Sequence, residues 1–208
     1  MPKVSQEYRD ARREQILSAA KRCFLRDGFH ETSMQDLFAE AGLSSGAVYR
    51  YFASKEEMIA AIAEENLRDM AAVIHGLATS RRSQGLGAAL AEVLEAVRVK
   101  DAQSELGAMA VLVWSEALRT PALAEQVGAT LAQMRADLAD IVREDQGRNG
   151  LPRKANVDAL TVLLIAIVPG FILQLALFGD QAVAGVPAAA RALWPAQPRS
   201  ARPSSATR

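Results

Sequence analysis

The sequence predicts an all-α fold, with three N-terminal helices followed by a larger helical domain. Apolar residues recur at three- and four-residue steps along most of the 208 residues, which is the spacing of helices that bury one face. No alternating apolar and polar pattern is long enough to predict a sheet. A chain of this length that is 50% hydrophobic can bury both a small module and a larger core. We therefore divide it into residues 1–55, residues 56–194 and a disordered polar tail, 195–208.

The first helix is predicted from Tyr8 to Asp27, where Asp27 and Gly28 end it. Its apolar side chains recur on one side: Ile16, Leu17, Ala20, Phe24 and Leu25. Its other faces are basic, with Arg9, Arg12, Arg13, Lys21, Arg22 and Arg26. A solvated surface and a phosphate-binding surface both fit this pattern. Only Lys3 is basic before Arg9, which gives little support to a basic arm ahead of the helix.

The segment that follows predicts two short helices joined by a tight turn. Thr32 is expected to cap the first, with Gln35 in the reciprocal position of a capping box. Its apolar face comprises Met34, Leu37, Phe38 and Ala41. Gly42 ends the helix, because a turn between crossed helices needs a residue that tolerates positive φ. Such a pair of helices is typical of a helix-turn-helix, a motif that binds DNA.

The second helix of the pair is expected to begin after Ser44 and to present small side chains to DNA. Val48 and Phe52 are four residues apart and point inward, which leaves on the solvent side Ser45, Gly46, Ala47, Tyr49 and Arg50. Glycine and alanine let the backbone approach base edges, and tyrosine hydroxyls can contact phosphates.

A further capping box, Ser54 with Glu57, begins the fourth helix, with Lys55 in its first turn. Free backbone amides and a lysine at a helix N-terminus suit a phosphate group. We therefore expect Lys55 to contact the DNA backbone, a solvated side chain being the alternative.

Residues 32–57 together resemble the DNA-binding signature of TetR-type transcriptional regulators. The resemblance lies in Ala-Gly-Leu-Ser at 41–44, Gly-Ala-Val-Tyr-Arg-Tyr-Phe at 46–52 and Ser-Lys-Glu-Glu at 54–57, and it covers about the first quarter of the chain. Phe38 departs from the pattern, since the family more often has isoleucine or valine there. We expect this departure to change the packing of the core and to leave DNA binding intact.

The resemblance implies a ligand-responsive homodimer, most often a repressor, that binds a near-palindromic operator in the bacterial cytoplasm and so associates with the nucleoid. Carried over residue by residue, the resemblance implies base contacts by Ser45, Gly46, Ala47 and Tyr49. It implies phosphate contacts by Thr32, Ser33, Ser44, Arg50, Tyr51 and Lys55. Packing beneath the recognition helix is the alternative for Tyr49.

The net charge of zero hides an uneven distribution. Residues 1–55 carry +2, residues 56–190 carry −6 and residues 191–208 carry +4. The acidic excess therefore lies away from the predicted DNA-binding face. Because +2 is modest for a nucleic-acid binder, we expect affinity to depend on two heads acting together.

Catalytic and metal-binding chemistry is not indicated. Cys23 stands alone beside Phe24 and is expected to fill the core, and His30 and His75 lack the spaced partners of a metal site. No glycine-rich phosphate loop, nucleophile elbow or carboxylate pair stands out. We expect no enzyme activity and no cofactor; a hidden enzyme would need a polar cluster in its core.

The rest of the chain predicts helices at 54–77, 86–100, 105–119, 121–144, 159–178 and 187–194. Core packing accounts for each apolar residue singly. As a set, eight residues suggest a pocket for an apolar or aromatic effector: Met70, Ile74, Met109, Val113, Trp114, Met134, Phe171 and Gln174. The helix at 54–77 leaves the head and enters this core, so a ligand that tilts it would change the spacing of the two heads.

The apolar run 159–178 has two interpretations. It is long enough to span a bilayer, which would make the chain a membrane-anchored DNA-binding protein. It also fits a helix buried between its own core and a partner's. Pro169, Gly170 and Gln174 argue against the membrane. The resemblance favours the second interpretation, since TetR-type proteins dimerise through their last two long helices, here about 157–178 and 187–194.

Overall fold

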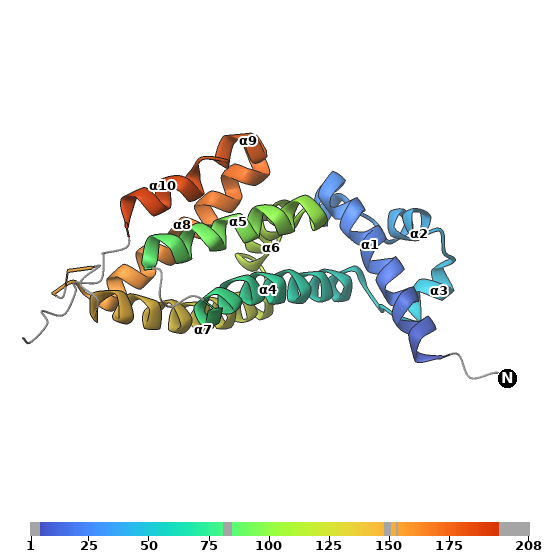
Figure 1. Ribbon diagram of the computed structural model, residues 1–208. Coiled ribbons are helices and arrows are strands. Elements are labelled where there is room, and N and C mark those ends of the chain that lie inside the picture. Colours follow the sequence, from blue (N-terminus) through green and yellow to red (C-terminus); the bar gives the residue numbers. More distant parts are fainter. Residues whose placement is uncertain (1–4, 81–84, 148–150, 153, 196–208) are drawn as a thin grey trace, which may run out of the picture.

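The structure is a computed structural model that describes residues 5–80, 85–147, 151–152 and 154–195, without the side chains of residue 74 and residues 76–80. Every regular element in these ranges is an α-helix, as the sequence predicts (Figure 1). At one end lies a small head formed by α1 (Gln6–Glu31), α2 (Met34–Ala41) and α3 (Ser45–Tyr49). Lys3 and the tail from residue 196 lie outside the described residues.

The helices after the head form an elongated bundle, in which α4 runs from the head along the length of the molecule (Figure 1). They are α4 (Lys55–Ser80), α5 (Leu86–Ser104), α6 (Leu106–Ala117), α7 (Pro121–Gly147), α8 (Val157–Phe178), α9 (Asp180–Val183) and α10 (Val186–Leu193). Each predicted helix is present, and the ends differ by a few residues. The one-turn α9 is not predicted, because four residues are too few for a periodic pattern.

Turn and capping residues decide the course of the head. Ser5 caps α1, and Gly28 interrupts α1 with φ 80°, so the predicted stop at this glycine is confirmed although one more turn follows. The predicted cap of α2 is wrong by one residue: Ser33, not Thr32, accepts from the third amide of α2 and pairs with Asp36. Gly42 ends α2 with φ 65°, in the left-handed region that favours glycine.

Two hydrophobic clusters hold the molecule together. The first joins the head to the start of α4 and takes in Met109 and Val113 of α6 and Leu123 of α7. The second fills the bundle between α4, α5, α7, α8 and α10. Because α6 and α7 supply side chains to the first cluster, the head packs directly on the bundle and can move with it.

The helix α8 runs unbroken through Pro169 and buries one of its faces. Its buried side chains face α5, α6 and α7: Thr161, Leu164, Val168, Phe171, Ile172 and Leu175. Its other face is exposed and apolar, with Val162, Leu163, Leu173, Leu177 and Phe178. Among the described residues, α8 alone has the length and apolar composition to cross a membrane, a property it shares with core helices of soluble proteins.

The helix α10 packs along α5 (Figure 1). The two helices approach closely at Gly87, where an added Cβ would collide with the carbonyl oxygen of Trp194. Arg98 of α5 also holds the start of α9, because its guanidinium binds both carboxylate oxygens of Asp180 at 2.7 and 2.8 Å. The same contact lowers the pKa of Asp180.

Candidate nucleic-acid interface

The recognition helix α3 is held from beneath and leaves its first turn free. Ser44 accepts from the amide of Ala47 at 3.3 Å, and Val48 is fully buried. Ser45 and Gly46 are exposed, as predicted, whereas Ala47 is half-buried. An added Cβ at Gly46 would meet no atom within 4 Å, so the space beside this backbone is open to a ligand.

Tyr49 packs on one side and is exposed on the other, so both alternatives stated from the sequence stay open. Its ring meets Phe38 edge-on, with centroids 5.4 Å apart and planes at 69°. The residue nevertheless remains 51% exposed. Phe38, the departure from the family pattern, therefore supports one side of the tyrosine ring, while the exposed part stays available to DNA.

The predicted phosphate contacts are not all accessible. Ser33, Ser44 and Arg50 are exposed, and Tyr51 is half-buried. Thr32 is 1% exposed, and its hydroxyl donates to the carbonyl oxygen of Gly28 at 2.7 Å. The prediction for Thr32 is therefore wrong in this conformation, because the side chain closes the turn after α1 and has no surface to offer.

Lys55 lies at the start of α4, but it is not simply solvated. Its ammonium group donates to the carbonyl oxygens of Thr32 at 2.8 Å and His30 at 3.3 Å. These carbonyls lie at the end of α1, where intrahelical donors have run out. Ser54 caps α4 as predicted, and Glu57 accepts from Ala53 instead of Ser54.

Ion pairs take up much of the positive charge of the head. Lys21 pairs with Glu65 at 2.5 Å, Arg22 with Glu40 at 2.6 Å, and Arg26 with Asp27 at 2.8 Å. The guanidinium of Arg22 lowers the pKa of Glu40. Within the described residues four arginines of the head form no ion pair: Arg9, Arg12, Arg13 and Arg50.

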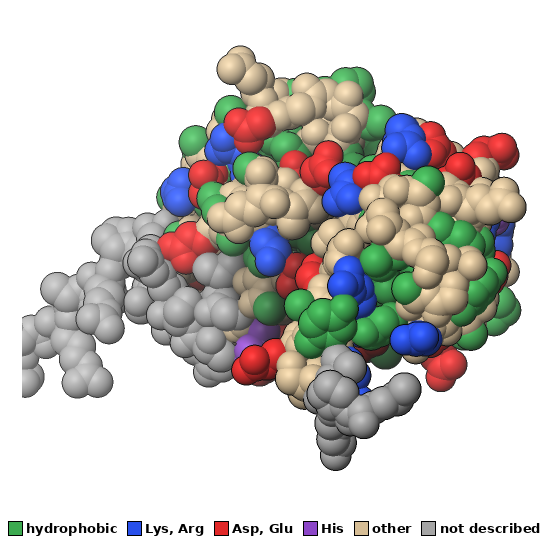
Figure 2. Space-filling view, turned by 90° about the vertical axis from the view of Figure 1, so that its right-hand side faces the viewer, with side chains coloured by type: hydrophobic (Ala, Val, Ile, Leu, Met, Phe, Trp, Pro, Cys, Tyr) green, Lys and Arg blue, Asp and Glu red, His purple; other side chains and the backbone are tan. Residues whose placement is uncertain are grey.

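The face that bears α2 and α3 shows basic and acidic side chains interspersed (Figure 2). No single basic block covers it. Where the unpaired arginines lie therefore matters more than the net charge.

The effector residues predicted from sequence do not form one site. Met70, Met134 and Phe171 are buried in the bundle cluster and Trp114 packs against it, but Met109 and Val113 belong to the head cluster. Gln174 is exposed, and its amide donates to its own helix at Gly170, so its assignment to a core pocket is wrong. The side chain of Ile74 lies outside the described residues.

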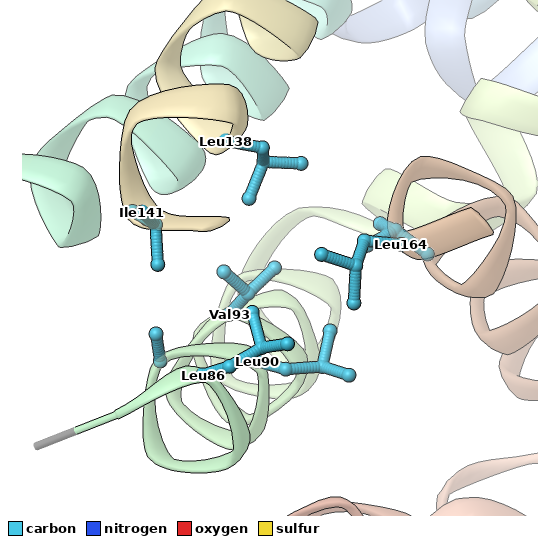
Figure 3. A pocket seen from close by; sticks show the side chains of 8 residues that line it. Leu86, Leu90, Val93, Leu138, Ile141 and Leu164 are labelled. Atoms are coloured by element: carbon cyan, nitrogen blue, oxygen red, sulfur yellow. The ribbon is translucent and has the colours of Figure 1, made fainter. Parts of the chain in front are cut away.

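A different set of residues surrounds a cavity in the bundle. Aliphatic side chains of α5, α7 and α8 converge on it from three sides (Figure 3): Leu86, Ala89, Leu90, Val93, Leu138, Ile141, Leu164 and Val168. Its free volume is about 10 Å³, room for no more than a single water. The sequence signal for these residues was their inward helical spacing, which does not separate a cavity lining from ordinary core.

The single cysteine is buried, and each of the two histidines lies beside a carboxylate. Burial raises the pKa of the Cys23 thiol and so disfavours the reactive thiolate. His30 lies 3.1 Å from Glu116, and His75 lies 3.2 Å from Asp137. In the part of the chain that the structure describes, no three His, Cys, Asp or Glu side chains are grouped to hold a metal ion.

Two family models match the chain. Residues 16–62 match bacterial regulatory proteins of the tetR family, and residues 86–194 match the C-terminal domain of BetI-type transcriptional repressors. The first match contains α2, α3 and the start of α4, and the second runs from α5 to α10. The first match thus covers most of the head and extends into α4, and the second covers the bundle from α5 onward.

Individual proteins resemble the chain in the same two ways. An uncharacterized HTH-type transcriptional regulator of Bacillus subtilis strain 168, YfiR, is 50% identical over 66 residues, 32% of this chain and 32% of that protein. Salmonella enterica GusR has a TM-score of 0.69 at 24% identity, over 92% of this chain and 98% of that one. FadR from Bacillus subtilis in complex with stearoyl-CoA has a TM-score of 0.67 at 16% identity, over 88% and 97%. The two structural likenesses show the fold.

Proposed function

Because this chain belongs to the TetR family of bacterial transcriptional regulators and has a BetI-type C-terminal domain, we propose that it is a homodimeric, effector-responsive repressor. The observation that carries the proposal is the exposed first turn of α3, Ser45 to Ala47, next to arginines that form no ion pair with a described residue. A helix with small side chains enters the major groove closely, and unpaired arginines nearby bind the backbone. Its place of action is the cytoplasm, on operator DNA.

Base contacts fall to Ser45, Gly46, Ala47 and Tyr49 in this proposal. Phosphate contacts fall to Ser33, Ser44, Arg50, Tyr51 and Lys55. Two heads of a dimer would enter successive major grooves roughly 34–36 Å apart. Selecting bound fragments from random duplex DNA tests this directly: two inverted half-sites about one helical turn apart are expected, and recovery of unrelated fragments would contradict the proposal.

Dimerisation through α8 is supported by its exposed apolar face. Leu163, Ala166, Gly170 and Leu173 follow one another at three- and four-residue steps, so they form a single stripe along the helix, with Val162 beside its first residue. Leu163 is 54% exposed and Leu173 43%. A continuous apolar surface of this kind is typical of a protein interface, and α8 of a second copy would cover it.

Charge placed on the stripe tests the dimer. Leu163→Glu combined with Leu173→Glu should yield a folded monomer by light scattering, with operator binding lost because the second head no longer assists the first. Val99→Glu is the control, since Val99 is an apolar residue 53% exposed on a different helix, α5. A double variant that stays dimeric would remove this part of the proposal.

The effector is proposed to be an aliphatic molecule that opens the cavity of Figure 3. Support comes from the lining, which contains eight aliphatic side chains and no polar one. FadR, of similar fold, is described in complex with stearoyl-CoA. A ligand that favours a different spacing of the heads would act through α4, and a coupling of about 1–3 kcal/mol would weaken operator binding roughly 5- to 150-fold.

A length series of fatty acids and alkanols tests the effector class. Longer chains should raise the melting temperature more and release operator DNA, since affinity rises with buried apolar area. Val93→Phe should abolish both effects by filling the cavity. An aromatic series that acts while the aliphatic series does not would contradict the assignment.

A membrane-anchored DNA-binding protein is the second candidate, because α8 has the length and composition of a span. Its Leu164, Val168 and Ile172 lie within the bundle cluster, and extraction into lipid would expose that cluster. Purification without detergent distinguishes the two: a dimer in aqueous buffer removes the anchored form, and recovery only with membranes would favour it.

A further inference from the structure

A groove separates the N-terminal half of α1 from the recognition helix. Tyr8, Arg9 and Arg12 of α1 form one wall, and the other contains Ala47, Arg50 and Tyr51 from α3 and the turn after it. The groove has a volume of about 340 Å³ and contains three guanidinium groups and no carboxylate. None of the three arginines forms an ion pair with a described residue.

Arg12 is held in place before any ligand arrives. Its guanidinium donates to Gln15 Oε1 and to the Tyr8 hydroxyl, each at 2.7 Å, and lies 5.2 Å from the centre of the Tyr8 ring. These bonds occupy two of the five N–H donors of an arginine, so others remain for a ligand. An arginine that is already ordered loses little conformational entropy on binding.

The groove has a fixed geometry because α1 is tied to the helix-turn-helix. Gln15 Nε2 donates to the carbonyl oxygen of Ala41, the last residue of α2, at 2.9 Å. Nearby carboxylates on α1 have other partners: Asp10 accepts from Gln6 at 2.8 Å and Glu14 from Ser18 at 3.2 Å. Because no carboxylate lines the groove, its three guanidinium groups present their positive charge to an anion.

We infer that this groove binds a backbone phosphate of the DNA strand that borders the major groove entered by α3. Ala47 and Arg50 belong both to the recognition segment and to the groove wall, so a helix lying in the major groove brings the groove to the adjacent strand. Three guanidinium groups and two phenol hydroxyls are donors for phosphodiester oxygens. The inference rests on the proposed function and adds Tyr8, Arg9 and Arg12 of α1 to the DNA contacts.

A coupling experiment between protein and DNA tests the inference. Arg9→Gln with Arg12→Gln is compared with Arg22→Gln and the wild type on the selected operator and on a scrambled duplex, over a range of salt concentrations. Arg22 is the matched control because it lies on the same helix but pairs with Glu40. The double variant should bind both duplexes more weakly, with a salt slope smaller by about 0.9 for each phosphate that it no longer neutralises.

Single methylphosphonate substitutions in the operator then locate the contact. At one position outside the bases read by α3, neutralising the phosphate should weaken DNA binding by the wild type and by Arg22→Gln. Binding by the double variant should not change. If the double variant shows the same salt slope and the same phosphate dependence as Arg22→Gln, the inference is overturned. The proposed function still stands in that case, provided that the wild type prefers the operator to the scrambled duplex. A wild type without sequence preference would instead overturn the proposed function.

A free anion has the same chemistry as a DNA phosphate, and inorganic phosphate separates the two. At constant ionic strength it should change the melting temperature of the wild type and the double variant equally. A larger rise in the wild type, together with no position-specific effect of methylphosphonate, would overturn the inference in favour of a small-anion site.

Discussion

Lys55, in the first turn of α4, donates a hydrogen bond of 2.8 Å to the carbonyl oxygen of Thr32, the C-cap residue of α1. The contact joins the helix that leaves the head to the turn that precedes α2. An ammonium group has three donors, and two are used on carbonyl oxygens, so the third can still reach a phosphate. If Lys55 contacts DNA as proposed, one side chain would serve both the geometry of the head and the DNA contact.

Replacing Lys55 should therefore have two measurable effects. Lys55→Ala removes the donor for the α1 carbonyls and should lower stability by about 1 kcal/mol, or roughly 2–4 °C in melting temperature for a chain of this size. It should also weaken binding to every duplex and reduce the salt slope by about 0.9. Normal stability with an unchanged slope would contradict both roles.

Ser45 should affect sequence preference more than general affinity. It is exposed in the first turn of α3, beside the open backbone of Gly46. Ser45→Ala is expected to change the ranking of operator variants at one base pair by about 1–3 kcal/mol while leaving the salt slope as it was. Competition binding with single-base operator variants measures this. A uniform loss on all duplexes would instead assign Ser45 to the backbone.

The recognition helix was predictable because its signals are local. The cap at Ser44, the glycine at 42 and the inward pair Val48 and Phe52 lie within eleven residues, and each is confirmed. The N-cap of α2 was less predictable, because the adjacent residues Thr32 and Ser33 can both cap a helix. The turn at Gly28 brings a carbonyl to the hydroxyl of Thr32, which leaves Ser33 as the cap.

The interior of the bundle was less predictable, since periodicity shows that a residue is buried but not what it packs against. Met109 and Val113 follow the same spacing as other core residues, yet α6 extends them into the head cluster. Gln174 lies on a helix that is apolar on all sides, so its sequence does not show which face the bundle covers. The groove lined by Arg9, Arg12 and Arg50 depends on where the N-terminal half of α1 lies relative to α3, which no local sequence pattern shows.

Stability should depend on pH through the capping box of α2. Asp36 Oδ2 accepts from the hydroxyl of Ser33 at 2.6 Å and from its amide at 2.9 Å, and these bonds lower the pKa of Asp36. A lowered folded-state pKa stabilises the fold above the ordinary value of 3.8, and this contribution is lost as the pH falls through the folded-state value.

Asp36→Asn should consequently melt below the wild type at neutral pH, and the gap should close as the pH falls below 3.8. Glu125→Gln is a suitable control, because Glu125 makes no hydrogen bond or ion pair with a described residue. Melting curves between neutral and acidic pH give the comparison. A gap of constant size at every pH would show that the charge of Asp36 contributes nothing.

The crossing of α10 over α5 requires glycine at position 87. A Cβ there would collide with the carbonyl oxygen of Trp194 and lie 2.8 Å from that of Ala190, and both oxygens belong to the backbone. Gly87→Ala should therefore push α10 outward and cost about 1–3 kcal/mol, as overpacking does elsewhere. Trp194 packs against the bundle cluster, so its fluorescence should shift to longer wavelength as it becomes exposed.

Gly128→Ala on α7 separates this effect from helix propensity. An added Cβ at Gly128 meets no atom within 4 Å, so alanine there should leave stability unchanged or raise it by up to about 1 kcal/mol. If α10 also borders the proposed dimer interface on α8, Gly87→Ala should weaken dimerisation and therefore operator binding. A higher protein concentration should then restore operator binding. A Gly87→Ala variant as stable as Gly128→Ala would mean that α10 does not pack on α5 at this distance.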